Sequence, residues 1–294
     1  MARRNEDKVI RNNNKKAHQK IKAQNKKETG KPRVSTSLRR TTNIKLAHGL
    51  GGEHVEGFHA VETLINNSKR RVTHLFVNKE QVDSPEITKL LYDAERKHIR
   101  VTKLSREQFL GRTKTESPQG VIAYCSEKKP RDIDDLLMNP KAFLIALDSV
   151  TDPNNIGAIV RSAEVAGATG VILPKHRSGH LTPSAVKAAA GAVEFMEFGL
   201  VPGIPAFLQR ANKAGVTIFG MAGEAKKTIY DLDKRQISDR PVVIVMGSEG
   251  KGLSQLVRKR CDELIRIPQV GKVESLNVSA AAAVALIHMS HLRL

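Results

Sequence analysis

Short apolar segments alternate with helical ones from about residue 143 to residue 294, and this alternation restricts the possible folds more than any other feature. The runs 143–147 and 242–246 are apolar throughout, as strands buried on both faces are. Strands that alternate with helices predict an α/β fold, with a mostly parallel sheet covered on both faces. Ligands of such sheets bind at the carboxyl ends of the strands. We therefore expect a site in the loops that follow Leu147, Phe219, Met246 and Ile267.

Apolar periodicity and capping residues set the expected boundaries in this part of the chain. Asp152 is an N-cap candidate with Pro153 in the first turn, and Gly167 is a natural end for that helix. The expected strands are 143–147, 170–173, 195–198, 216–219, 242–246 and 264–267. The expected helices are 152–166, 184–192, 204–214, 253–260 and 277–291.

A smaller unit, residues 51–127, precedes this domain and also mixes strands with helices. Helical spacing predicts helices at 55–64 and 87–96, and short β-branched or apolar runs predict strands at 72–77, 99–101 and 120–124. Residues 128–140 contain prolines and several charges, which are typical of a linker. The sequence therefore predicts a small α/β domain, a linker, and a larger domain over residues 141–294.

The positive charge is concentrated at the N-terminus. The chain has 49 Lys and Arg against 30 Asp and Glu, a net charge of +19. Residues 1–50 hold 15 of the basic residues and three of the acidic ones, and they contain no Phe, Tyr or Trp. Such a segment is too polar to fold alone, so we expect a disordered basic arm. It would bind the phosphates of a polyanion without reading sequence, although a merely solubilising tail is the alternative.

Several classes of protein are excluded by what the sequence lacks. No apolar run reaches the roughly 18 residues that a membrane helix needs. Cys125 and Cys261 are the only cysteines, so neither a disulfide framework nor a cysteine zinc site organises the fold. The histidines form no metal cluster, and we expect no metal. The start of the chain does not resemble a secretory signal, so we expect a cytoplasmic protein.

Three loops carry unusual residues. The first is 152–157, with Arg161 further along the same helix; the second is 246–252; the third is 267–279. The glycines of the second loop are spaced G-x-x-G-x-G, which fits neither the dinucleotide fingerprint nor a P-loop. They would still let a purine or its ribose approach the backbone at Gly247, unless the loop is only a tight turn.

Each of these loops also has a simpler interpretation. Arg161 lies in an otherwise apolar helix, where an arginine is usually solvated or salt-bridged. Ser275 and Asn277 are N-cap candidates for the last helix, and Glu249 could be only a surface charge. Taken one at a time, the loops do not identify a function.

Together, and in this order, the loops resemble those of the SpoU family of RNA 2′-O-ribose methyltransferases, in the SPOUT superfamily. The resemblance covers about residues 143–294, and it rests on 152–157 with Arg161, on 245–252, and on 267–268 with 275–279. Residues 55–125 are similar to the small substrate-binding domain of the bacterial 23S rRNA guanosine 2′-O-methyltransferase branch. That branch often has His-Gln-Gly near the end of this domain, whereas this chain has Pro118-Gln119-Gly120.

The resemblance implies a C-terminal trefoil knot that binds S-adenosylmethionine, and a homodimer whose active site uses both subunits. Arg161 would be the catalytic centre. Because a guanidinium stays protonated, we interpret Arg161 as a phosphate clamp rather than as a base. Asn155, Glu249, Ser275 and Asn277 would orient Arg161 and the ribose. The cofactor would be bound by Gly247, Ile267, Leu276, Ala222 and Gly223.

The expected function is methyl transfer from S-adenosylmethionine to a ribose 2′-hydroxyl, with a guanosine of 23S rRNA as the leading substrate. A tRNA ribose 2′-O-methyltransferase of the same family is one alternative. An inactive RNA-binding factor in ribosome assembly is another, although the set of Asn155, Arg161, Glu249, Ser275 and Asn277 argues against it.

Overall fold

The computed structural model describes residues 49–176, 180–273 and 275–294. All of them belong to one compact unit, Ala47–Leu294. The predicted basic arm, residues 1–50, lies outside the described residues except for Gly49 and Leu50.

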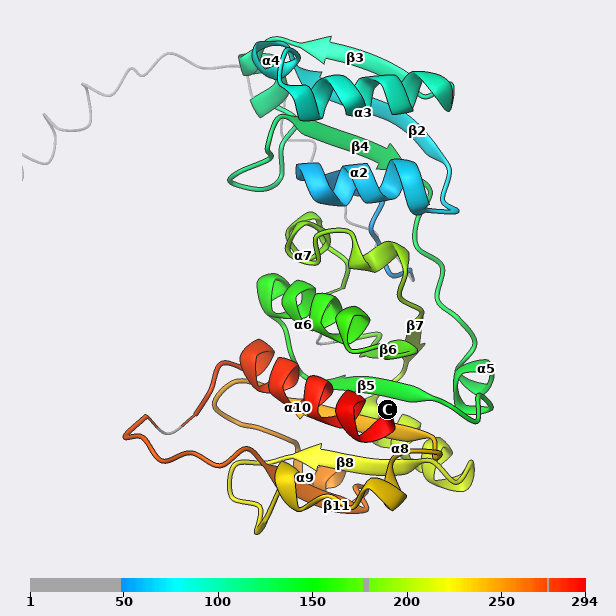
Figure 1. Cartoon of the computed structure of the whole chain (residues 1–294), viewed down its shortest axis with the longest axis vertical. Coiled ribbons are helices and arrows are strands. Elements are labelled where there is room, and N and C mark those ends of the chain that lie inside the picture. Colours follow the sequence, from blue (N-terminus) through cyan, green and yellow to red (C-terminus); the bar gives the residue numbers. More distant parts are fainter. Residues whose placement is uncertain (1–48, 177–179, 274) are drawn as a thin grey trace, which may run out of the picture. The chain divides into compact units, whose positions relative to one another are not determined.

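The first part of the described chain builds a four-stranded sheet (Figure 1). Its order is β1 (His54–Glu56), β4 (Val121–Cys125), β2 (Val72–Asn78) and β3 (Arg100–Leu104). Strands β2 and β3 are parallel, and β4 runs antiparallel to β1 and β2. Helices α2 (Phe58–Asn67) and α3 (Pro85–Arg96) cover one face, and the short helix α4 (Arg106–Leu110) packs on the other. The predicted helix at 55–64 is therefore wrong at its start, because residues 54–56 pair with β4.

The second part builds a seven-stranded sheet in which every pair of neighbouring strands is parallel. This confirms the predicted α/β fold with a mostly parallel sheet. Its order is β7 (Phe198–Val201), β6 (Gly170–Pro174), β5 (Phe143–Asp148), β10 (Val242–Gly247), β8 (Thr217–Met221), β11 (Glu263–Arg266) and β9 (Lys227–Thr228).

Helices cover both faces of this sheet. Apolar side chains alternate along β5, so that Ile145 joins one core cluster and Leu144 joins the other. The first cluster is closed by α6 (Pro153–Val165), α7 (Pro183–Ala188) and α10 (Val278–Arg293). The second is closed by α5 (Ile133–Leu137), α8 (Ile204–Lys213) and α9 (Gln255–Arg258).

Other expected segments also differ from the structure. Residues 128–140 contain α5, whose buried Ile133, Leu136 and Leu137 pack against the large sheet. Their helical spacing was hidden by the charges and prolines around them. The strand expected at 195–198 begins only at Phe198, because a 3-10 turn, Ala192–Glu194, occupies the preceding residues.

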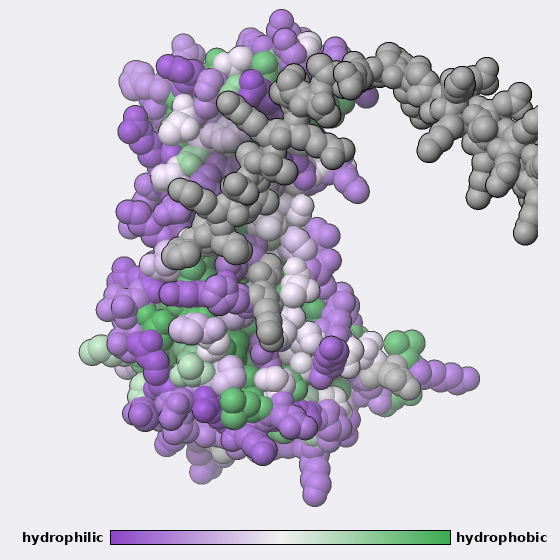
Figure 2. Space-filling view, turned by 180° about the vertical axis from the view of Figure 1, so that it is seen from behind, coloured by the Kyte–Doolittle hydropathy of each residue, from purple (hydrophilic) through white to green (hydrophobic). Residues whose placement is uncertain are grey.

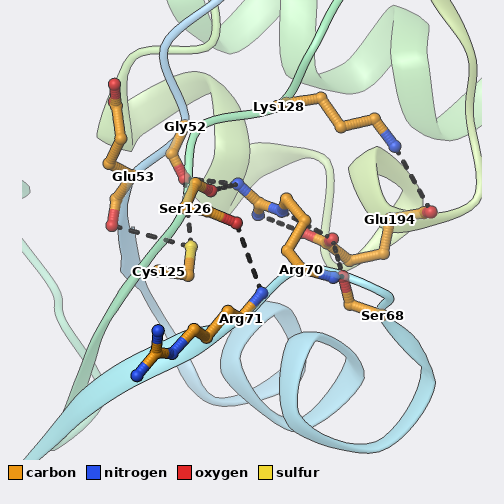
Figure 3. A network of polar contacts seen from close by, with 9 residues as sticks. All are labelled: Gly52, Glu53, Ser68, Arg70, Arg71, Cys125, Ser126, Lys128 and Glu194. Atoms are coloured by element: carbon orange, nitrogen blue, oxygen red, sulfur yellow. Dashed lines mark hydrogen bonds and ion pairs between the residues drawn. The ribbon is translucent and has the colours of Figure 1, made fainter.

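A buried ion pair joins the small sheet to the large domain (Figure 3). Arg70, which precedes β2, pairs with Glu194 of the turn beside α7, and their side chains are 8% and 2% exposed. The Arg70 Nη1 donates to the carbonyl oxygens of Gly52 and Ser126, at 2.8 and 3.1 Å. Ser68 Oγ donates to Glu194 Oε2 at 2.6 Å. Both charges are therefore paired and hydrogen-bonded, as buried charges must be.

The described residues show neither a membrane-spanning helix nor a metal cluster. No helix among them is long and apolar enough to span a bilayer. No group of three or more His, Cys, Asp or Glu among them is arranged to hold a metal ion. Hydrophilic side chains cover most of the face shown in Figure 2.

We expect Glu194→Ala to lower the free energy of unfolding by about 3–5 kcal/mol, because it leaves the Arg70 charge buried without its partner. The matched control is Asp134→Ala. It breaks the ion pair between Arg210 and Asp134, whose side chains are 47% and 69% exposed. This change should lower the free energy of unfolding by less than about 1 kcal/mol. Urea unfolding of both variants measures the difference. Equal losses of unfolding free energy in the two variants would contradict the importance of the buried ion pair.

Candidate functional site

A pocket of about 770 Å³ opens where β8, β10 and β11 end. Its walls come from the segments that follow these strands and from the start of α10, as expected for the carboxyl ends of parallel strands. All five residues predicted to bind a cofactor line this pocket: Ala222, Gly223, Gly247, Ile267 and Leu276. Leu276 is 44% exposed, so an apolar side chain is accessible at the pocket wall.

The loop after β10 is a tight turn that closes on itself. Ser248 and Gly252 exchange backbone hydrogen bonds of 3.2 and 2.9 Å. Gly250 and Gly252 have φ values of +77° and +62°, which glycine adopts without strain. A Cβ on Gly247 would lie 2.2 Å from the carbonyl carbon of Gly252. The turn therefore needs glycine at 247 because its own backbone passes there, whereas a Cβ on Gly223 would meet nothing within 4 Å.

Three of the predicted catalytic residues form one hydrogen-bonded cluster. Asn155 Nδ2 and Asn277 Nδ2 each donate to Glu249 Oε1 at 2.9 Å. Asn277 Nδ2 also lies 3.0 Å from Asn155 Oδ1. Glu249 and Asn277 line the pocket, so the cluster stands at its wall. We call these three residues the Asn–Glu–Asn cluster.

Helix caps hold two members of the cluster in place. Asp152 caps α6 by accepting from the backbone N–H of Asn155 at 2.9 Å, which fixes Asn155 in the first turn. Asn277 is the N-cap of α10, and its Oδ1 accepts from the backbone N–H of Ser279 at 2.8 Å. This geometry leaves the Asn277 amide nitrogen to donate to Glu249, so one side chain both caps the helix and builds the cluster.

The remaining two predicted catalytic residues lie apart from this cluster. Ser275 is exposed and lines the pocket, but Asn277 rather than Ser275 caps α10. Arg161 is exposed on α6 and does not line the pocket. Residues four apart share a helix face, so Arg161 lies beside Val165, which is 68% exposed.

Several charged residues at the pocket were not predicted from the sequence. Glu224 and Arg258 form an ion pair there, and Arg266 adds a second guanidinium. Asp148, at the end of the neighbouring strand β5, does not line the pocket; it is 7% exposed and accepts from the backbone N–H of Ser254 at 2.8 Å. Glu224, Arg266 and Asp148 lie at or just after strand ends, so the strand-end rule could have found them. Arg258 lies on α9 and carried no such signal.

Family models match both parts of the described chain. Residues 142–287 match the SpoU rRNA Methylase family, and residues 54–131 match the RNA 2'-O ribose methyltransferase substrate binding model. The chain is also 38% identical to 23S rRNA (guanosine-2'-O-)-methyltransferase RlmB of Pseudomonas aeruginosa over 242 residues, 81% of this chain and 95% of that protein. This chain belongs to the SpoU rRNA methylase family. The resemblance drawn from the three loops is confirmed.

A further relative is similar in sequence, and two solved structures are similar in fold. The protein of the same name from Haemophilus influenzae is 37% identical over 247 residues, 82% of this chain and 98% of that protein. The SpoU methyltransferase AviRb from Streptomyces viridochromogenes, in complex with the cofactor AdoMet, superposes with a TM-score of 0.68 at 24% identity, over 82% of this chain and 89% of that one. An AdoMet-bound rRNA methyltransferase from Sinorhizobium meliloti superposes with a TM-score of 0.67 at 24% identity, over 82% of this chain and 87% of that one. Both structures share the fold.

We expect Gly247→Ala to lower the thermal stability of the protein, because its Cβ would collide with the backbone of Gly252 and Leu253. Gly223→Ala should leave stability nearly unchanged, since the same atom would enter open space. Thermal unfolding followed by circular dichroism compares the two variants. A Gly247→Ala variant as stable as Gly223→Ala would show that the loop can open without cost.

Proposed function

We propose that this protein transfers the methyl group of S-adenosylmethionine to a ribose 2′-hydroxyl of RNA, and that the ribose belongs to a guanosine of 23S rRNA. The observation that carries the proposal is the Asn–Glu–Asn cluster on the wall of a pocket at the strand ends. The relatives named above, which act on this kind of nucleotide, support the choice of substrate. We also propose that the enzyme acts in the cytoplasm.

The pocket suits S-adenosylmethionine in size and in chemistry. Its volume of about 770 Å³ lies within the roughly 300–1,000 Å³ range of small-molecule sites. Ile267 and the exposed Leu276 offer an apolar surface to a purine, and Ala222 and Gly223 also line the pocket. The charged Glu224, Arg258 and Arg266 can meet the amino and carboxylate groups of the methionine part. When bound, this cofactor supplies an electrophilic methyl group.

The side chains of this protein then have to place and activate a weak nucleophile. A ribose hydroxyl must be aligned with the methyl group and must lose its proton. In our proposal the Asn–Glu–Asn cluster and Ser275 hold the ribose at the pocket wall. Arg161 holds an RNA phosphate by charge-assisted hydrogen bonds and stabilises the negative charge that develops. The phosphate or another group takes the proton, because a guanidinium stays protonated.

We further propose that the protein acts as a homodimer, with Arg161 reaching the pocket of the partner subunit. Arg161 does not line the pocket of its own chain. Three apolar side chains on α6 and α10 are exposed: Val165 by 68%, Val284 by 38% and Ile287 by 49%. Burying them against a second copy would remove apolar surface from water. A contact through the Val165 face would also bring Arg161 to the subunit boundary.

The trefoil knot is part of the same proposal. The segments after β8, β10 and β11 meet at one pocket, and α10 then packs into the core cluster beside α6. A chain that tucks its last helix through such crossing segments would form a knot, which is rare among folds. The knot would hold the backbone of the pocket rigid before the cofactor arrives.

We expect Arg161→Ala to fold and to bind S-adenosylmethionine normally, because in our proposal Arg161 contacts an RNA phosphate and not the cofactor. Methyl transfer should fall by about 10²-fold or more, as for a lost stabiliser of transition-state charge. The measurement is transfer of tritium from methyl-labelled S-adenosylmethionine into rRNA, with calorimetry of cofactor binding as the control. Near-normal transfer in this variant would rule out the role of Arg161. The absence of transfer by the unmodified protein would overturn the proposed function itself.

Two separately inactive variants test the shared site. Arg161→Ala damages the phosphate side, and Asn277→Ser damages the Asn–Glu–Asn cluster while keeping a side chain that can cap α10. If each site uses both subunits, a mixed dimer has one site with both changes and one with neither. Mixing the variants should then restore activity, up to about one site per mixed dimer.

No recovery after proven subunit exchange would mean that each site lies within one chain. Exchange is shown independently by copurification of a tagged and an untagged variant. Sedimentation that finds only monomer at the working concentration would also reject the dimer.

A further inference from the structure

One face of the small sheet carries a row of rings and positive charge that crosses all four strands. The register places His54 of β1 opposite Tyr124 of β4, Tyr124 opposite His74 of β2, and His74 opposite Arg100 of β3. Directly opposed residues point to the same face. Phe76, two residues after His74, faces the same way. Its ring is stacked on that of His74, with centroids 4.1 Å apart, and lies edge-on to that of Tyr124, with centroids 5.7 Å apart.

The stability of the small domain depends mainly on the other face. There Leu75 and Val77 pack with residues of α2 and α3 in the main core. Of the helices in the described residues, only α4 packs on the ring-bearing face, where its Phe109 covers Phe76. His74 and Tyr124 remain partly exposed. Aromatic side chains that stay accessible on a sheet offer a flat surface on which a ligand ring can stack.

Positive charge surrounds these rings. The guanidinium of Arg112 lies 4.6 Å from the centre of the Phe76 ring. Desolvation lowers the pKa of His74, and the nearby charges of Arg100 and Arg112 lower it further. Within the described part of the chain, neither arginine has a carboxylate within ion-pair distance. Both charges are therefore available to an anionic partner.

A hollow and a fixed loop complete this face. The hollow has a volume of about 390 Å³ and is lined by Leu104, Gln108, Gly111 and Arg112. The loop beyond Arg112 is held by Glu56, which is fully buried and faces the same side as His54. The Glu56 carboxylate accepts from the backbone N–H of Thr115 at 3.0 Å and lies 2.6 Å from His54 Nε2. Arg112 thus projects from a segment that the sheet itself anchors.

We propose that this face binds an unpaired base of the RNA substrate, which stacks on Tyr124 while Arg100 and Arg112 contact the flanking phosphates. The proposal rests on the proposed function in one respect, namely that the ligand is RNA. An unpaired base fits because paired bases hide their ring faces within the helix. Stacking on aromatic side chains combined with basic contacts is how proteins bind single-stranded nucleic acid. The small domain would then select unpaired RNA near the methylated nucleotide.

A single tryptophan provides a direct probe of stacking, because the chain contains none. Tyr124→Trp places the reporter in the row, and Tyr92→Trp places it on α3, where Tyr92 is 60% exposed. The probes are a single-stranded RNA of about ten nucleotides and a duplex of the same length. We expect the single strand to quench the fluorescence of Tyr124→Trp but not that of Tyr92→Trp, and we expect the duplex to quench neither.

Side-chain removal tests the same face by affinity. Tyr124→Leu should weaken binding of the single strand about tenfold or more, without changing the slope of log affinity against log salt. Arg100→Gln should lower that slope by about one. Tyr124→Phe keeps the ring and should recover most of the loss. Tyr92→Leu and Arg96→Gln are matched controls, because they remove a ring and a guanidinium that lie 5.8 Å apart on α3.

Several results would overturn the proposal. Equal quenching by duplex and single strand, or equal losses in the α3 controls, would show that the face does not select an unpaired base. A change in Tyr124→Trp fluorescence on deleting residues 1–48, or on raising the protein concentration without RNA, would assign the face to the basic arm or to a second copy. Methyl transfer by the unmodified protein is measured in parallel. Transfer without quenching refutes only this inference, whereas quenching without transfer refutes the proposed function.

Discussion

The central position of β10 determines most of the site. This strand lies between β5 and β8, hydrogen-bonded to both in parallel register, and all of its residues are buried. Parallel pairing brings the ends of β5, β8 and β10 to the same edge of the sheet. The register with β5 continues to Gly247, opposite Asp148, and Asp148 then binds the backbone of Ser254 beyond the turn. The loop that carries Glu249 is therefore fixed at both of its ends.

The Asn–Glu–Asn cluster depends on this arrangement. Its members are separated by 94 and 122 residues in sequence, measured from Asn155 to Glu249 and to Asn277. Each is placed by a separate local device: a capped first turn for Asn155, a glycine turn for Glu249, and an N-cap for Asn277. Only the sheet brings the three together. Because two amides donate to one carboxylate oxygen, the cluster presents a defined orientation to any group that enters the pocket.

Away from the pocket, buried polar residues fix the relative positions of segments. Apolar packing alone would determine these positions less specifically, because it is not directional. Arg70 and Glu194 link the small sheet to the large domain. Glu56 anchors the loop that carries Arg112. Each carboxylate is enclosed by donors, so its position is more specific than that of an apolar contact. Buried ion pairs of this kind contribute more to geometry than to net stability.

The sequence alone determined the α/β class, the parallel sheet and the loops that matter, because apolar periodicity, caps and strand ends are local signals. It also selected every residue of the Asn–Glu–Asn cluster, but only through the family resemblance of its loops. The sequence did not reveal α5, whose apolar spacing lay among charges, or the strand pairing of residues 54–56. It gave no sign of the ring row, since His54, His74, Arg100 and Tyr124 come from four separate strands. Tertiary structure decided that Gly247 accommodates its own loop and that Arg161 lies outside the pocket. Such facts depend on which distant segments come into contact. Strand register and packing determine these contacts, and no local run of residues does.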